Sequence, residues 1–230
     1  MKSQVRVALI GARGRMGQTI LELAKNDPKI DIVAQCDIGD AIDSAFQDCE
    51  VAIDFSNASS IDEVCRAASR NRKALVIGTT GHSSEQRQLI EKTAKSLPIV
   101  FASNFSVGVN TLFALTRRAA EILGSEFAPQ IVETHHTKKK DAPSGTAKTL
   151  GEILKKELQT EIPVESIREG DVVGEHTVTF AAPSERLVLT HSAGSREIFA
   201  GGALRAAQWV VGKPARLYSM QDVLGIGPAK

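Results

Sequence analysis

The residues with the clearest capacity for chemistry lie together in the stretch from His135 to Thr146, which reads HHTKKKDAPSGT. Its two imidazoles can move protons near neutral pH, and its three lysines add positive charge. The run at 143–146 is typical of a helix start, with Ser144 or Thr146 as its candidate cap, and the free N–H groups of a helix start attract anions. We therefore predict a pocket for a small dianionic substrate with a proton donor beside it. The alternative is a solvated basic loop followed by a capped helix.

Two regular elements must hold this stretch in place. The preceding segment, 129–134, is predicted to be a strand, and the following segment, 147–158, has apolar residues at helical spacing. The stretch is thus a strand-to-helix loop, and loops held by rigid elements are common places for function.

The beginning of the chain has a pattern typical of dinucleotide binding. A continuous apolar run at 5–10 predicts a buried strand, and it leads into glycines 11, 14 and 17 and a helix to about residue 25. The glycines alone are also explained by a tight turn and close helix packing. Their position between a strand and a helix favours a dinucleotide site.

The next predicted strand, 30–36, ends at Asp37, where a dinucleotide fold places the acid that binds the adenosine ribose. A surface acid at a strand end is the alternative. Residue 38 is isoleucine, so no arginine directly follows the acid to hold a 2′-phosphate. The pattern favours NAD over NADP, although Arg13 and Arg15 are cations within reach of such a phosphate.

Strands and helices continue to alternate up to residue 106. Further strands are predicted at 51–55, 74–77 and 99–102, and helices at about 60–71 and 84–97. The predicted fold class is α/β, with a Rossmann-like doubly wound parallel sheet. Ligands bind at the carboxyl ends of such strands, so the turns at 78–81 and 103–106 are candidates to line the cofactor, with ordinary turn chemistry as the alternative.

A second region, 107–196, is predicted to be an α+β substrate-binding and oligomerisation domain with a mixed sheet. Its expected elements are helices at 107–123 and 147–158 and strands at 129–134, 164–168, 174–182 and 185–192. Two helices cannot cover both faces of a four-stranded sheet, so we expect a partner subunit on the uncovered face. The predicted domains are therefore a dinucleotide-binding domain at 1–106, this second domain, and a return at 197–230 that completes the first domain with a helix at 202–211.

Composition limits the class of protein. The chain has 28 basic and 27 acidic residues and a net charge of +1, which gives no reason to expect nucleic acid or a membrane surface as a partner. The three cysteines form no CxxC pair, which argues against a disulfide framework or a zinc site. The sequence has no pattern of a signal peptide or membrane helix, so we expect a cytoplasmic protein.

The string from Glu133 to Ala147 resembles the signature EThHxxKxDAPSGTA of the 4-hydroxy-tetrahydrodipicolinate reductase (dihydrodipicolinate reductase) family. The resemblance extends over nearly the whole chain, through GARGRMG, DFS at 54–56, GTTG, SNFSVGVN at 103–110, REG at 168–170 and GEHTV at 174–178. It implies NAD(P)H-dependent reduction of 4-hydroxy-tetrahydrodipicolinate, with loss of water, in the diaminopimelate route to lysine. It also implies NADH, NADPH or both as cofactor, and a homotetramer joined through the substrate-domain sheets.

The resemblance assigns roles residue by residue. His135 is implied as proton donor and acceptor, and Lys139 as a proton donor and carboxylate partner, while Lys138 and Lys140 fall at variable positions. The implied substrate-binding residues are His136, Ser144, Gly145 and Thr146. The implied cofactor-binding residues are Gly11, Ala12, Arg13, Gly14, Arg15, Met16, Asp37, Gly78, Thr79, Thr80, Ala102, Ser103, Asn104 and Phe105, with Arg196 and Phe199 at the crossing between domains.

One departure concerns the segment 37–51, which is short for the family and leaves little chain to shape the adenosine site. Two other functions stay open from the residues. One is a different Rossmann-fold oxidoreductase acting on an amino or keto acid, and the other is a non-enzymatic NAD-binding sensor.

Overall fold

The computed structural model describes residues 4–37 and 39–226. The chain divides into two compact units, which are described separately. The first, here called the parallel-sheet unit, contains the residues up to Ser106 and Glu197–Gly225. The second, the mixed-sheet unit, contains Val107–Arg196. Within the described ranges, no helix is long and apolar enough to cross a membrane.

The parallel-sheet unit is built on six parallel strands in the order β10-β5-β4-β3-β1-β2. The strands are β1 (Val5–Ile10), β2 (Ile30–Cys36), β3 (Val51–Asp54), β4 (Ala74–Ile77), β5 (Pro98–Phe101) and β10 (Arg216–Tyr218). The helices are α1 (Arg15–Ala24), α2 (Ile42–Ala45), α3 (Ile61–Asn71), α4 (Ser84–Thr93), α7 (Glu197–Val210) and α8 (Met220–Leu224). β2 lies on one side of β1, and β3, which follows β2 in the chain, lies on the other side of β1. The direction in which strands are added therefore reverses between β1 and β3.

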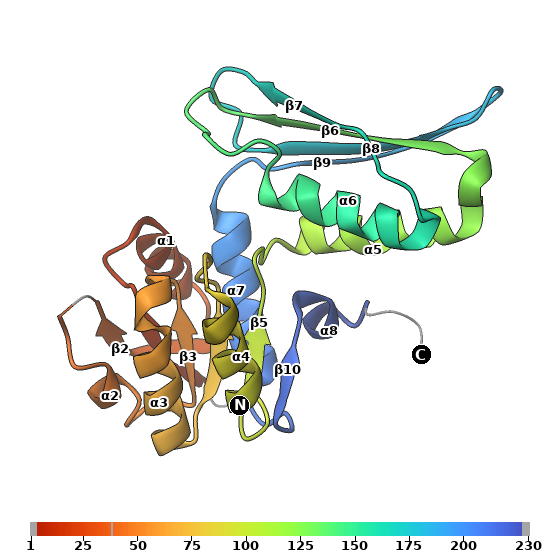
Figure 1. Ribbon diagram of the computed structural model, residues 1–230. Helices are drawn as coiled ribbons and strands as arrows, with labels where there is room; N and C mark the ends of the chain where they lie inside the picture. The colour runs from red at the N-terminus through yellow and green to blue at the C-terminus, as the bar shows by residue number, and fades with distance from the viewer. Residues whose placement is uncertain (1–3, 38, 227–230) are drawn as a thin grey trace. The chain divides into compact units, whose positions relative to one another are not determined.

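Both faces of this sheet are covered, which explains the continuous apolar runs (Figure 1). Val7 and Leu9 of β1 pack in one core with α1, α7 and α8, whereas Ala8 and Ile10 pack in a second core with α2, α3 and α4. Successive side chains of a strand point to opposite faces, so each strand serves both cores. The predicted Rossmann-like fold class is confirmed.

Three details of this unit differ from the sequence predictions. Helix α7 begins at Glu197 rather than at residue 202, and α4 ends at Thr93 rather than at 97. The glycine pair 201–202 made the first turn of α7 look like a break, yet Gly202 is buried where that helix packs closely against the backbone of Phe105. The short elements α2, β10 and α8 were not predicted, because three to five residues carry no periodic signal.

The mixed-sheet unit has four strands in the order β7-β6-β8-β9. These are β6 (Ala128–His135), β7 (Val164–Arg168), β8 (Glu175–Ala181) and β9 (Arg186–Ser192). β6 pairs in parallel with β7 and antiparallel with β8, so the sheet is mixed, as predicted. Helices α5 (Val107–Leu123) and α6 (Gly145–Leu158) lie along one face of the sheet (Figure 1), and Ile131, Val178 and Phe180 pack beneath them.

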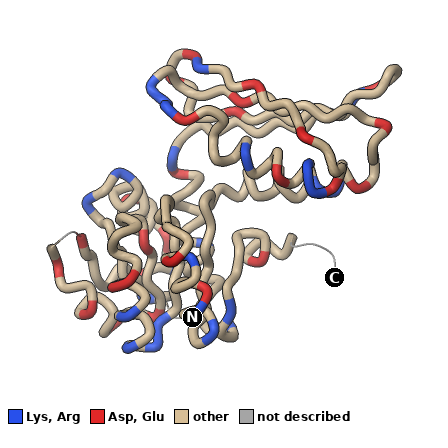
Figure 2. The backbone as a smooth tube through the Cα atoms, viewed as in Figure 1, with Lys and Arg blue, Asp and Glu red and all other residues tan. Residues whose placement is uncertain are grey.

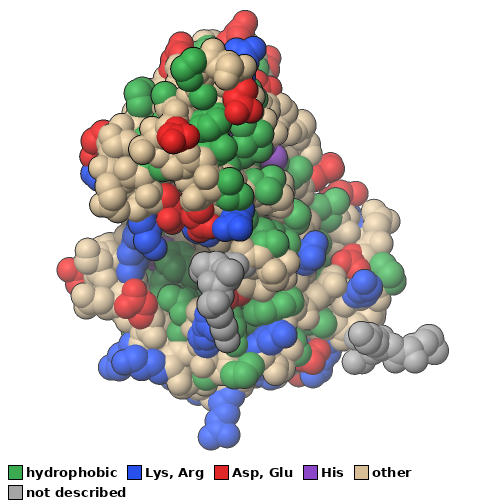
Figure 3. Space-filling model, turned by 90° about the vertical axis from the view of Figure 1, so that its right-hand side faces the viewer, with side chains coloured by type: hydrophobic (Ala, Val, Ile, Leu, Met, Phe, Trp, Pro, Cys, Tyr) green, Lys and Arg blue, Asp and Glu red, His purple; other side chains and the backbone are tan. Residues whose placement is uncertain are grey.

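Charges of both signs are mixed over the two units. Lys and Arg are scattered among Asp and Glu along the backbone (Figure 2), and the face shown in Figure 3 has both kinds of charge among apolar side chains. The basic loop after β6 is therefore a local concentration of positive charge within a nearly neutral chain.

Candidate functional site

Strand β6 carries the first part of the site on its covered face. Ile131, Glu133 and His135 occupy alternate positions, so they point to the same side as the helices. Ile131 and Glu133 are both fully buried, and His135 is 8% exposed. A carboxylate and an imidazole thus lie side by side on the covered face of the sheet, next to the apolar core that Ile131 joins.

Glu133 is surrounded by hydrogen-bond donors. One carboxylate oxygen, Oε2, is in short contact with Nδ1 of His135. The other, Oε1, accepts from the Arg168 guanidinium at 2.8 Å and from the backbone N–H of Ser144 at 3.3 Å. A buried charge is stable only when it is paired and hydrogen-bonded, and both oxygens meet that condition here.

These contacts set the charges of the pair. Burial alone would raise the pKa of Glu133, but hydrogen bonds led by that from Arg168 outweigh it and lower the pKa to about 2. Burial lowers the pKa of His135, and Lys139 and Arg168 add to that effect while Glu133 opposes it. Glu133 is therefore ionised and His135 mainly neutral at neutral pH, with the Nδ1 proton directed at the carboxylate.

His176 of β8 packs against His135 from the neighbouring strand. The two rings meet edge to face with centroids 5.1 Å apart, and Nε2 of His176 lies 3.1 Å from the Ser144 hydroxyl. That hydroxyl also accepts from the Ala147 N–H and caps α6. Burial, with a smaller effect of His135, lowers the pKa of His176 to about 4, so this ring is neutral at physiological pH.

The basic loop separates its three lysines. Lys139 is partly buried and pairs with Asp141 at 2.8 Å, whereas Lys138 and Lys140 are exposed. The hydrogen bond from Lys139 lowers the pKa of Asp141. His136 is partly buried, and its Nδ1 is buried without a hydrogen-bond partner among the described residues.

The start of α6 holds the other predicted substrate residues. Ser144 is the N-cap and is 3% exposed, so its side chain is engaged inside the unit. Gly145 is exposed, and a Cβ at this position would meet no described heavy atom within 4 Å. Thr146 follows it and is partly buried. The backbone N–H groups at this helix start can therefore be approached by an anion.

Glu133, His135 and His176 also place one ligand-type atom each within 4.8 Å of one another. The Glu133 oxygens are already used by three donors, one of them a guanidinium 2.8 Å away. A second cation at this point would be repelled by Arg168, so the cluster is better described as a hydrogen-bonded network than as a metal centre.

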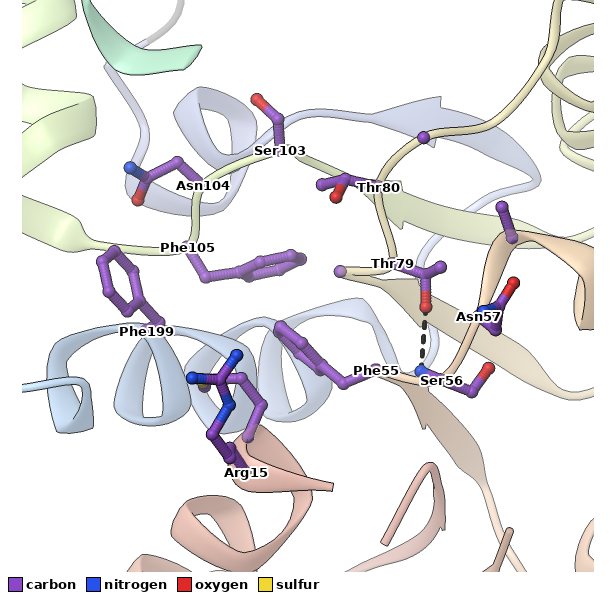
Figure 4. Close-up of a pocket in the computed structure, with 14 residues that line it drawn as sticks. Arg15, Phe55, Ser56, Asn57, Thr79, Thr80, Ser103, Asn104, Phe105 and Phe199 are labelled. Carbon is purple, nitrogen blue, oxygen red and sulfur yellow. Dashed lines mark hydrogen bonds between the residues drawn. The ribbon is translucent and has the colours of Figure 1, made fainter. Parts of the chain in front are cut away.

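The parallel-sheet unit contains a cavity of about 720 Å³ at the carboxyl ends of its strands (Figure 4). Phe55 and Phe105 meet at its centre with ring centroids 5.7 Å apart. Ser56 donates its backbone N–H to the Thr79 hydroxyl at 2.9 Å, the dashed line in Figure 4. Nine of the predicted cofactor residues line this cavity: Arg15, Met16, Gly78, Thr79, Thr80, Ser103, Asn104, Phe105 and Phe199.

The remaining predicted cofactor residues lie elsewhere. Asp37 lines a second cavity of about 310 Å³, which shares Ser56 and Asn57 with the larger one. Arg196 is exposed and belongs to the mixed-sheet unit. Five others do not line the larger cavity, namely Gly11, Ala12, Arg13, Gly14 and Ala102.

The glycine turn has a steric reason. Gly11 has φ +83°, and a Cβ there would lie 2.4 Å from the Phe55 carbonyl oxygen. A Cβ on Gly17 would lie 2.2 Å from the Gly11 carbonyl oxygen. The turn therefore brings α1 close to β1 and β3, and no side chain caps the first turn of α1, which leaves its N–H groups facing outward for an anion.

Asp54 holds in place two residues that line the larger cavity, Ser56 and Gly78. It is fully buried, and its Oδ1 accepts from the Ser56 backbone at 3.0 Å and, in a short contact, from the Ser56 hydroxyl. Its backbone carbonyl accepts from Gly78 N–H at 2.9 Å. The end of β3 is thereby tied to the turn after β4.

Sequence reasoning assigned no role to five residues that the structure places in these sites: Phe55, Ser56, Glu133, Arg168 and His176. All five stand inside motifs that carried the family resemblance. Glu133 was also detectable from strand periodicity, since it shares a face with the apolar Ile131.

Comparisons with known proteins agree across the chain. The model of the dihydrodipicolinate reductase N-terminus matches residues 5–105, and that of its C-terminus matches residues 108–224. The chain belongs to the dihydrodipicolinate reductase family. It is 46% identical to a 4-hydroxy-tetrahydrodipicolinate reductase of Akkermansia muciniphila, covering 96% of this chain and 98% of the relative.

Other relatives extend the same conclusion. A 4-hydroxy-tetrahydrodipicolinate reductase of Methanoculleus marisnigri is 42% identical over 96% of this chain and 100% of its own length. Among solved structures, the dipicolinate-bound dihydrodipicolinate reductase of Paenisporosarcina sp. TG-14 has a TM-score of 0.84 at 22% identity, with coverage of 95% of this chain and 98% of that one. The family predicted from the motifs is confirmed, and with it the enzyme class, an oxidoreductase of the Rossmann-fold type.

Proposed function

We propose that this dihydrodipicolinate reductase family member reduces 4-hydroxy-tetrahydrodipicolinate to tetrahydrodipicolinate, with loss of water, in the diaminopimelate route to lysine. The observation that carries the proposal is the His135 imidazole, paired with a buried carboxylate beside an open helix start and Lys139. This arrangement offers a proton and a carboxylate-binding surface in a chain that matches the reductase family at both ends.

Loss of water from the 4-hydroxy substrate leaves a conjugated ring, and the reduction of that ring needs a hydride on one ring carbon and a proton on the adjacent one. When bound, NADH or NADPH would supply the hydride for ring carbon C4. His135 delivers the proton from Nε2 once that atom has been protonated, and Glu133 stabilises the imidazolium. Lys139, His136 and the N–H groups of Gly145 and Thr146 hold the substrate carboxylates.

The cofactor fits the two adjoining cavities of the parallel-sheet unit. The residues of the larger cavity, Phe55 and Phe105 among them, would hold the nicotinamide half, and those of the smaller cavity would hold the adenosine half. The uncapped start of α1 supports a pyrophosphate. The Phe55 and Phe105 rings would exclude water from this cavity and so protect a bound hydride donor from solvent.

We propose NADH as the preferred cofactor. Three carboxylates, from Asp37, Asp40 and Glu63, line the smaller cavity. Arg13 is 75% exposed and its guanidinium lies 3.6 Å from Asp40, so its charge is partly matched already. A 2′-phosphate would add negative charge to this acidic cavity, whereas ribose hydroxyls can donate to Asp37. We expect a higher kcat/KM with NADH, and Asp37→Ala to narrow the difference between the cofactors.

A second copy of the chain is the proposed partner of the mixed sheet. The face opposite α5 and α6 carries Val132, Ile167 and Val188, and the last two are 36% and 46% exposed. We propose a homotetramer through this face, and Val188→Glu should reduce the mass measured by light scattering. The three cysteines are buried and free, which fits the reducing cytoplasm.

A steady-state assay with freshly prepared 4-hydroxy-tetrahydrodipicolinate tests the activity through oxidation of NADH or NADPH. We expect His135→Gln to lower kcat by about 100-fold or more while the KM for cofactor changes little. Lys139→Gln should lower kcat and raise the substrate KM, and Lys140→Gln is its matched exposed control. No cofactor oxidation by the unmodified protein would refute the proposed function, and activity with a keto acid instead would favour another oxidoreductase.

A further inference from the structure

We infer that Glu133 is a positioning residue for catalysis: it fixes the tautomer and orientation of His135 so that only Nε2 exchanges protons with the substrate. The inference rests on the proposed function for its consequence, namely turnover. Its structural part concerns the imidazole alone and can be tested without substrate.

The geometry around the two ring nitrogens carries the argument. Nδ1 of His135 is occupied by the Glu133 carboxylate. Nε2 has no hydrogen-bond partner among the described residues, and it lies close to Gly174, where a Cβ would be 2.9 Å from it. An ionised carboxylate is only an acceptor, so Nδ1 must carry the hydrogen, and the lone pair of the neutral ring is then on Nε2.

Glu133 is itself fixed from two other directions. Arg168 donates to its Oε1 from β7, and the Ser144 N–H donates to the same oxygen from the start of α6. Arg168 also donates to the backbone carbonyl of Asp141 at 2.6 Å, which ties this pair to the loop that carries Lys139. The carboxylate therefore has little freedom to turn away, and the ring keeps one orientation through the catalytic cycle.

The charges facing His135 show why a carboxylate matters there. Arg168 from β7 and Lys139 from the loop are cations that disfavour an imidazolium, and neutral His176 from β8 adds burial. Asp141 forms an ion pair with Lys139, so its negative charge is largely balanced by that lysine. Glu133 is thus the one nearby described anion in direct contact with the ring, and its loss would leave the imidazolium disfavoured on every side.

The test compares Glu133→Gln with Glu133→Asp. Glutamine keeps the size and loses the charge, whereas aspartate keeps the charge and shortens the side chain. Positioning by charge predicts a fall of kcat of about 100-fold in Glu133→Gln with a small change in substrate KM, and a smaller fall in Glu133→Asp. It also predicts that the decline of kcat at alkaline pH moves to lower pH in Glu133→Gln. A merely structural role predicts the opposite order, because glutamine is the better steric match.

Two controls keep the result interpretable. Glu185→Gln changes an exposed carboxylate in the turn between β8 and β9 and should leave kcat and its pH profile unchanged. Glu133→Gln combined with Arg168→Met removes both charges, so it should recover stability if Glu133→Gln alone unfolds, yet it should stay as slow as the single variant. Recovery of wild-type kcat in the double variant would overturn the inference.

Nitrogen NMR of the imidazoles separates this inference from the proposed function. With ¹⁵N-labelled histidine and His135→Gln for assignment, the unmodified protein should show His135 as the Nδ1–H tautomer with an unprotonated Nε2. In Glu133→Gln the ring should show both tautomers and protonate at lower pH. An unchanged tautomer and titration in Glu133→Gln would overturn the inference even if the enzyme is active, and the expected NMR change would support it even if the substrate assignment fails.

Discussion

Acidification should destabilise this protein through His176, a buried histidine that stays neutral in the folded state. Burial, followed by the effect of His135, lowers its pKa from 6.5 to about 4. The sign follows from linkage. Between pH 6.5 and 4 the unfolded chain binds a proton at this residue and the folded chain does not, so the free energy of unfolding falls as the pH falls.

The size of the effect follows from the two pKa values. At pH 5 an imidazole with a pKa of 6.5 is mainly protonated, while one with a pKa of about 4 is mainly neutral. At this pH, proton binding at His176 favours the unfolded state over the folded state by a factor of roughly 30. This factor corresponds to about 2 kcal/mol of lost stability, whereas the loss at pH 7 is near zero. Glu133, with its pKa of about 2, remains ionised throughout this window and adds little to the change.

Urea unfolding at pH 7 and pH 5, at one fixed protein concentration, measures this difference. His176→Gln should cost about 1 kcal/mol at pH 7, because it removes the ring contact with His135 and weakens the bond to Ser144. Between pH 7 and pH 5, the free energy of unfolding of His176→Gln should fall by about 2 kcal/mol less than that of the unmodified protein. Thr177→Ser, on the same strand, removes no titratable group and should retain the full pH dependence. If His176→Gln and the unmodified protein lose the same stability, the buried neutral histidine is not the cause.

Glycine substitutions give further tests of the packing. Gly202→Ala should destabilise the protein by about 1–3 kcal/mol, because its Cβ would lie 1.8 Å from the Phe105 carbonyl oxygen, and thermal unfolding should detect it. Gly201→Ala in the same helix meets no described heavy atom within 4 Å and should instead stabilise by up to about 1 kcal/mol; a loss there would contradict the packing argument. Gly174→Ala should displace the His135 ring and lower kcat about 10-fold or more while leaving cofactor affinity, measured by fluorescence titration, unchanged.

Much of the parallel-sheet unit was predictable because its signals are local. A strand buried on both faces is a continuous apolar run, and the turns after such strands necessarily meet at one edge of the sheet. The turns at 78–81 and 103–106 follow two such strands, and residues 78–81 and 103–105 line one cavity. Phe55 was not predicted because its place in the cavity depends on a contact with Gly78, where a Cβ would lie 2.2 Å from the ring. A contact between residues this far apart in the chain produces no local sequence pattern.

The start of α7 shows the opposite case. Glycine is a poor helix former, and the sequence prediction began the helix only at the second of two adjacent glycines, residue 202. Tertiary packing decided otherwise, since Ala200 and Gly202 are buried and the small residue at 202 permits close approach to Phe105. Phe199 and Arg196 were both predicted to lie near the cofactor. Phe199 lines the larger cavity, whereas Arg196 is not among its lining residues and belongs to the mixed-sheet unit.

The network around His135 combines what a sequence can and cannot reveal. The alternation along β6 places Glu133 and His135 on one face and was visible in the sequence. Their partners arrive by strand register: His176 of β8 lies directly opposite Glu133, and Arg168 of β7 lies directly opposite His135. A slip of one residue in either strand would turn His176 or Arg168 to the uncovered face and leave Glu133 buried without its cation. The cost of that unpaired charge disfavours the slipped pairings, so the same contacts that prepare the imidazole for proton transfer also help to fix the register of the sheet.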